Sequence, residues 1–99
     1  MNVLFICNQN RSKTAEEIFR NKFKTKSAGL FNEKPVSKKE LERADLVVVM
    51  EDFQIGEIAK RFPSQYLKKR IVSLNVPDAY YYNQPELINI LNSKIKEAF

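Results

Sequence analysis

Two short apolar runs without polar alternation constrain the fold most strongly. They cover residues 3–6 and residues 46–50, and both are rich in β-branched or aromatic side chains. A strand that is apolar on both faces is typical of a parallel sheet covered by helices on each side. Residues 70–74 form a third, weaker run, and residues 25–28 fit a short edge strand. These segments predict a four-stranded sheet.

Between the runs, apolar residues recur at helical spacing. This spacing predicts helices over residues 12–24 and 53–62, the second of which Pro63 would stop. A capping-box pattern begins a short helix over residues 37–44, and Pro85 opens the last helix. Strands and helices thus alternate along the chain, which predicts an α/β fold: a four-stranded parallel sheet with helices on both faces.

Length and composition exclude several classes of protein. A chain of 99 residues fits a single domain, residues 1–99, with a small core. One cysteine excludes an internal disulfide, and the absence of histidine excludes Cys/His and Ser/His hydrolases and most zinc sites. We therefore expect neither a metal nor a cofactor.

Charge and hydropathy suggest where the protein works. The net charge of +5 favours anionic partners, but the basic residues form no dense stripe, so nucleic acid is not expected as a partner. No apolar run approaches the roughly 18 residues that span a bilayer, and the start lacks the basic flank of a signal peptide. We expect a cytoplasmic protein that does not associate with membranes.

The end of the first strand carries the strongest functional signal. Cys7 is followed by a polar segment and then by a helix start, where backbone N–H groups and the helix dipole bind anions and favour a thiolate. Arg11 adds a two-donor grip for an oxyanion. Asn8 and Asn10 tolerate the left-handed backbone of a tight loop. A nucleophile aimed at phosphorus fits this arrangement, but so does a small buried residue that ends a strand.

Several segments resemble the low-molecular-weight protein tyrosine phosphatases, in particular their short prokaryotic relatives. Residues 3–7 together with residues 10–16 resemble the opening of that family. Residues 27–29 resemble its Ser-Ala-Gly turn, residues 44–51 its third-strand segment, and residues 76–80 the loop with its general acid. The resemblance implies a phosphotyrosine protein phosphatase I-like fold, in agreement with the pattern of strands and helices.

The resemblance also implies a mechanism. Cys7 would attack phosphorus and form a cysteinyl-phosphate, and Arg11 would hold the equatorial oxygens. Asp78 would protonate the leaving phenolate and then activate water. Without the resemblance, Pro77-Asp78-Ala79 would be taken as ordinary turn chemistry. The substrate would be a phosphorylated protein or a small phosphomonoester, and inorganic phosphate or another oxyanion would bind at the same place.

Further residues are implied as substrate-binding groups. The loop amides would surround the phosphate, a serine would hydrogen-bond the thiolate, and a tyrosine would form the pocket wall and stack on a substrate ring. These residues are Asn8, Gln9, Asn10, Ser12, Tyr80 and Tyr81.

One departure from the family pattern leaves alternatives open. Three residues separate Cys7 from Arg11 where the family has five. The missing pair shortens the loop by up to roughly 7 Å, which works against encircling a phosphate. Lys13 lies at the family spacing but offers only a point charge. A weakened phosphatase-like domain that binds anions or a partner is one alternative. A Cys-phosphorylated phosphoryl carrier is another, although it would need neither Arg11 nor Asp78.

Overall fold

The structure is a computed structural model that describes residues 1–7, 10–31 and 35–98. The predicted phosphate-loop residues Asn8 and Gln9 lie outside the described residues. All other predicted site residues are within them.

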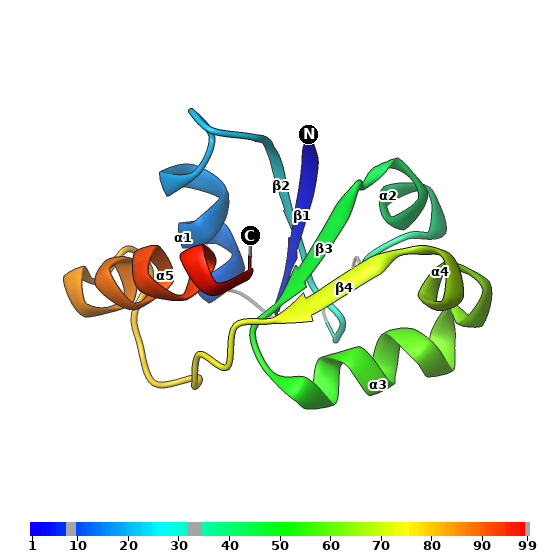
Figure 1. The fold of residues 1–99 in the computed structure, drawn as a ribbon. Coiled ribbons are helices and arrows are strands. Elements are labelled where there is room, and N and C mark those ends of the chain that lie inside the picture. Colours follow the sequence, from blue (N-terminus) through cyan, green and yellow to red (C-terminus); the bar gives the residue numbers. More distant parts are fainter. Residues whose placement is uncertain (8–9, 32–34, 99) are drawn as a thin grey trace.

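Four parallel strands form one sheet, as predicted (Figure 1). The strands are β1 (Asn2–Ile6), β2 (Lys24–Ala28), β3 (Leu46–Val49) and β4 (Arg70–Ser73), and their order is β2-β1-β3-β4. Because all the strands run in the same direction, their carboxyl ends share one edge of the sheet. In this order, β1 and β3 occupy the centre, so the residues that follow them lie where open α/β sheets bind ligands.

Helices cover both faces of the sheet, also as predicted. Figure 1 shows α1 (Asn10–Ile18) and α5 (Pro85–Ala98) on one side. The other side carries α2 (Lys38–Arg43), α3 (Asp52–Arg61) and α4 (Pro63–Lys68). No helix in the described part of the chain is both long and apolar enough to cross a bilayer.

Each face of β1 contributes to a separate apolar core. Val3 and Phe5 pack under α1 and α5, whereas Leu4 and Ile6 pack under α2 and α3. This division follows from the alternation of side chains along a strand. It explains why residues 3–6 are apolar without interruption, since both faces of the strand are buried.

The first helix and the segment after Pro63 differ from the prediction. The first helix begins at Asn10, where Ser12 was predicted. The first helix ends at Ile18, not near Lys24, because the chain must turn back to place Lys24 beside Asn2 in the sheet. Pro63 ends one helix and also begins another, α4, which the sequence pattern did not indicate. Proline suits the first position of a helix, because the N–H that it lacks has no partner within the helix there.

Candidate active site

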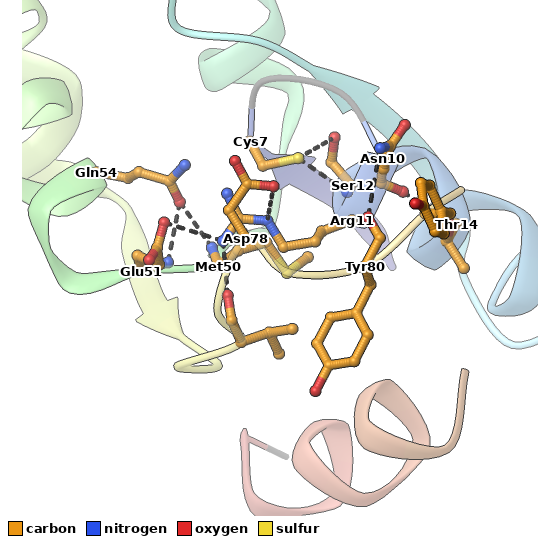
Figure 2. Close-up of polar contacts among 12 residues, drawn as sticks. Cys7, Asn10, Arg11, Ser12, Thr14, Met50, Glu51, Gln54, Asp78 and Tyr80 are labelled. Atoms are coloured by element: carbon orange, nitrogen blue, oxygen red, sulfur yellow. Dashed lines mark hydrogen bonds and ion pairs between the residues drawn. The ribbon is translucent and has the colours of Figure 1, made fainter. Parts of the chain in front are cut away.

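The cysteine lies directly after β1, in the middle of the sheet. Cys7 follows Ile6, which pairs with Ala28 of β2 and with Val49 of β3. The backbone N–H of Ser12 donates to Cys7 Sγ at 3.1 Å, and the thiol donates to Ser12 Oγ at 3.1 Å (Figure 2). The sulfur is therefore held against the first turn of α1, where backbone N–H groups and the helix dipole favour negative charge.

Burial alone does not separate the two interpretations of Cys7. Its side chain is 1% exposed and borders the apolar core under α1 and α5, as a packing residue would. Both contacts of the sulfur with Ser12 are hydrogen bonds, however, and a cysteine that served only as a packing residue would not need them. These contacts distinguish the surroundings of the sulfur from those of a cysteine held by apolar packing alone.

Arg11 is buried and its guanidinium is anchored at one end. The side chain is 3% exposed, and Nη1 donates to the Val76 carbonyl at 2.6 Å and lies 3.0 Å from Glu51 Oε2. Nε lies 4.0 Å from Asp78 Oδ1. No described residue accepts a hydrogen bond from Nε or Nη2, and an oxyanion that takes this two-donor edge would replace the Asp78 carboxylate beside Nε.

Asp78 reaches the site from the long connection between β4 and α5. This connection covers residues 74–84 and contains neither helix nor strand. Its first residues are held against the end of β3, because the N–H groups of Leu74 and Val76 donate to the carbonyls of Val49 and Met50 at 3.0 and 2.8 Å. Beyond that point Asp78 is largely exposed, with a side chain 69% accessible, and Figure 2 shows its carboxylate directed at Arg11.

The two tyrosines predicted to form the pocket wall differ in placement. The Tyr80 ring packs against the core under α1 and α5, and Figure 2 shows it pointing away from Cys7. The Tyr80 carbonyl accepts a hydrogen bond from Asn10 Nδ2 at 3.4 Å. Tyr81 is 80% exposed. Of the pair, Tyr81 is thus the side chain that is accessible for stacking on a ligand.

Two residues of the site were not predicted from the sequence. Glu51 pairs with Arg11, and Gln54 Oε1 accepts the backbone N–H groups of Met50 and Glu51 at 2.8 and 3.0 Å. Gln54 is fully buried, and its Nε2 has no hydrogen-bond partner within the described residues. A carboxylate directly after a central strand was the available signal, because the carboxyl ends of such strands border ligand sites.

The structure thus brings most of the predicted site together at one edge of the sheet. Cys7, Ser12, Arg11 and Asp78 gather there, and Asn10 contacts the loop that carries the aspartate. A pocket of about 430 Å³ lies elsewhere, between the starts of β1 and β2 and helix α2. Its lining includes none of the predicted residues. Among the described residues, no three His, Cys, Asp or Glu side chains form a group that could hold a metal ion.

Comparison with known proteins identifies the architecture. No protein-family model matches the sequence, and no curated protein sequence matches it. Among solved structures, the tyrosine phosphatase Wzb from Escherichia coli K30 in complex with phosphate has a TM-score of 0.77 at 19% identity. That alignment covers 98% of this chain and 94% of Wzb.

Two further structures agree. The low-molecular-weight protein tyrosine phosphatase from T. tengcongensis has a TM-score of 0.74 at 22% identity, covering 100% of this chain and 99% of that one. The YwlE arginine phosphatase from Geobacillus stearothermophilus has a TM-score of 0.64 at 21% identity, covering 97% and 84%. The fold of this chain is therefore that of the low-molecular-weight protein tyrosine phosphatases.

Proposed function

We propose that the protein hydrolyses phosphomonoesters through a cysteinyl-phosphate intermediate, with Cys7 as nucleophile. The observation that carries the proposal is the environment of the sulfur, which Ser12 holds at the start of α1 through two contacts of 3.1 Å. A buried arginine and an exposed aspartate stand next to each other at the same edge of the sheet. This combination fits a nucleophile, an oxyanion grip and a general acid.

In the first step, the Cys7 thiolate attacks phosphorus and an S–P bond forms. The bond between phosphorus and the leaving oxygen breaks, and Asp78, in its protonated form, gives its proton to that oxygen. The Ser12 hydroxyl, which accepts from the thiol in the resting protein, turns its own proton toward the sulfur once the thiol has ionised. The products are the alcohol or phenol and the cysteinyl-phosphate.

In the second step, water attacks phosphorus and the S–P bond breaks. Asp78, now a carboxylate, takes a proton from the water, so inorganic phosphate leaves and the Cys7 thiolate is restored. The same carboxyl group therefore serves as acid and then as base. Its exposure of 69% gives the incoming water access to it.

The anchoring of Arg11 supports its role as the oxyanion grip. Nη1 is occupied by Val76 and Glu51, and these two contacts fix the plane of the guanidinium. A planar fork whose orientation is already set loses little conformational freedom when it binds an oxyanion. The Nε and Nη2 donors would then form two parallel hydrogen bonds with the equatorial oxygens of the phosphoryl group.

We infer an aryl phosphate, such as a phosphorylated tyrosine in a protein, as the favoured substrate. The exposed ring of Tyr81 supports this, because an aromatic side chain on the connection that carries Asp78 can stack on a phenyl leaving group. The net charge of +5 favours acidic substrates in general. Neighbouring structures include tyrosine phosphatases and an arginine phosphatase, so phosphoarginine is the competing substrate.

A second candidate is a weakened domain that binds oxyanions without turnover. It is favoured by the short segment between Cys7 and Arg11, and by the position of Asp78, whose carboxylate lies 4.0 Å from the arginine Nε, close to where an anionic ligand would bind. A phosphoryl carrier is the third candidate. A carrier would need neither an oxyanion grip nor a general acid, so the pairing of Arg11 with Asp78 does not support it.

Turnover of p-nitrophenyl phosphate and of a phosphotyrosine peptide tests the proposal, with Cys7→Ser as the matched control of similar size. We expect phosphate release from both substrates and none from the variant. Phosphate or vanadate binding without turnover would favour the second candidate, and inserting two residues between Cys7 and Arg11 would then raise the rate. A phosphocysteine that persists after transfer from a donor, with no release of phosphate, would favour the carrier.

A further inference from the structure

We propose that Thr14 is a positioning residue. It holds the loop of Asp78 at a fixed position relative to the nucleophile, and so sets the efficiency of proton transfer to the leaving group. The inference rests on the proposed function for its catalytic meaning. It concerns residues 74–84, the loop between β4 and α5. Among the described residues, the side-chain hydrogen bonds of Thr14 go to Asn10 and Asn83, and not to the sulfur or to the guanidinium.

The loop needs support in its second half. Its first half is tied to the end of β3 by the N–H groups of Leu74 and Val76. Within the described part of the chain, the Asp78 side chain makes only the 4.0 Å contact with Arg11, and it is largely exposed. A side chain with so few contacts depends for its position on whatever holds the backbone on either side of it.

That support comes from one face of α1. Asn10, Thr14 and Glu17 are spaced by four and three residues, which places them in a row along the helix. All three reach the loop: Asn10 Nδ2 donates to the Tyr80 carbonyl at 3.4 Å, and Glu17 accepts from the Tyr82 hydroxyl. Thr14 lies between these two contacts.

Thr14 is the buried centre of the row. It is fully buried, its Oγ1 donates to the Asn10 carbonyl at 2.7 Å, and the same oxygen accepts the N–H of Asn83 at 2.9 Å. Because the hydroxyl proton is committed to the carbonyl, a lone pair of the oxygen is directed to Asn83. Asn83 has a φ of 59°, in the left-handed region that asparagine tolerates better than most residues.

The geometry couples the acid to the nucleophile. Helix α1 carries Arg11 and Ser12 in its first turn and Thr14 one turn later. A loop held by Thr14 therefore keeps Asp78 fixed relative to the helix turn that holds the Cys7 sulfur. If the hydroxyl is lost, Asp78 spends less time in reach of the leaving oxygen, while the sulfur and the arginine are unaffected.

The matched variants are Thr14→Val and Thr25→Val. Valine keeps the shape of threonine and removes only the hydroxyl. Thr25 Oγ1 donates to the carbonyl of Glu16 at 2.8 Å, so the control deletes a comparable bond to α1 that does not involve the loop. Thr14→Ser restores a hydroxyl and serves as the rescue.

Two substrates that differ in leaving group provide the kinetic readout. Phenyl phosphate, with a poor leaving group, depends on the general acid, whereas p-nitrophenyl phosphate, with a good one, depends on it less. We expect Thr14→Val to lower kcat/KM, which reports formation of the cysteinyl-phosphate, about tenfold for phenyl phosphate and less than about threefold for p-nitrophenyl phosphate. Thr14→Ser recovers most of the loss, and Thr25→Val changes both rates equally. A purely structural role for Thr14 predicts equal losses on the two substrates, and that result would overturn the inference.

Amide hydrogen exchange separates this inference from the proposed function. We expect Thr14→Val to speed exchange over residues 74–84 and Thr25→Val to leave it unchanged. Absence of turnover in the unmodified protein would defeat the proposed function but not the exchange experiment. Unchanged exchange over residues 74–84 in Thr14→Val would defeat the inference whether or not the protein is active.

Discussion

Arg11 Nη1 lies 3.0 Å from Glu51 Oε2, an ion pair that joins the first turn of α1 to the turn after β3. The arginine side chain is 3% exposed and the glutamate 33%, so the pair is only partly screened by water. Glu51 has two effects on the candidate oxyanion grip. Its oxygen fixes the orientation of the guanidinium, and its charge offsets the positive charge that attracts an anion.

Glu51→Gln separates these two effects. Glutamine keeps an acceptor oxygen for Nη1 but removes the negative charge, so the arginine keeps its orientation and attracts anions more strongly. We expect inorganic phosphate to bind about three- to tenfold more tightly, with kcat changed by less than about threefold. Calorimetric titration or competitive inhibition by phosphate measures this.

The control for this change is Glu57→Gln. Glu57 pairs with Arg61 at the same 3.0 Å and has similar exposure, 26%, but the pair lies within α3. We expect no change in phosphate affinity there. Weaker binding in Glu51→Gln would mean that Glu51 supports the anion site in a way that glutamine cannot replace.

Asp78→Asn is expected to change binding and turnover in opposite directions. The carboxylate lies 4.0 Å from Arg11 Nε and repels an incoming phosphate, so its neutral replacement should bind phosphate more tightly. The amide cannot donate a proton as an acid, so kcat should fall by about 10² or more. Steady-state kinetics and phosphate titration on the same variant measure both. If binding tightens but the rate does not fall, Asp78 is not the general acid.

The fold could be predicted because its main signal is local. The side chains of β3, Val48 among them, are buried on both faces of the strand. An uninterrupted apolar run of this kind is typical of a strand in a parallel sheet. The Ser37–Glu40 capping box was also predicted, and both of its hydrogen bonds are present. Helix α4 was missed because Pro63 was taken only as a stop, whereas its lack of an N–H also suits a helix start.

The site could be predicted only in part, because its contacts connect distant segments. The positions of Cys7 and Ser12 followed from a strand end next to a helix start, which is a short-range pattern. The pairing of Arg11 with Glu51 depends on the order of β1 and β3 in the sheet. Likewise, a turn-like segment places Asp78 near the arginine only once the loop has folded back along the sheet edge.

The pair of Tyr82 and Glu17 predicts a pH dependence above neutrality. The hydrogen bond to Glu17 is the main cause that raises the pKa of Tyr82 above its ordinary value of 10.0, since ionising the phenol would break this bond and place two negative charges together. A raised pKa in the folded protein means that the contact contributes stability below about pH 10 and loses it as the pH rises through the folded-state value.

Ultraviolet titration of the tyrosines tests this. We expect one tyrosine to ionise later than the others, and both Tyr82→Phe and Glu17→Gln should remove that late component. If the late component survives in Tyr82→Phe, another tyrosine is responsible. If Glu17→Gln leaves it unchanged, the hydrogen bond is not its cause.

Replacing Phe19 tests the packing of the core beneath the site. It lies just past the end of α1, is 1% exposed, and stacks on Phe5 of β1 with ring centroids 5.8 Å apart. Phe19→Ala removes this buried ring and leaves a cavity, so the free energy of unfolding should fall by about 3–5 kcal/mol in urea denaturation. Phe53→Ala removes a ring that is 54% exposed, and we expect a change within about 0.5 kcal/mol. Comparable losses in the two variants would contradict the placement of Phe19 in the core, and with it the packing that anchors α1 and the Cys7 sulfur beside it.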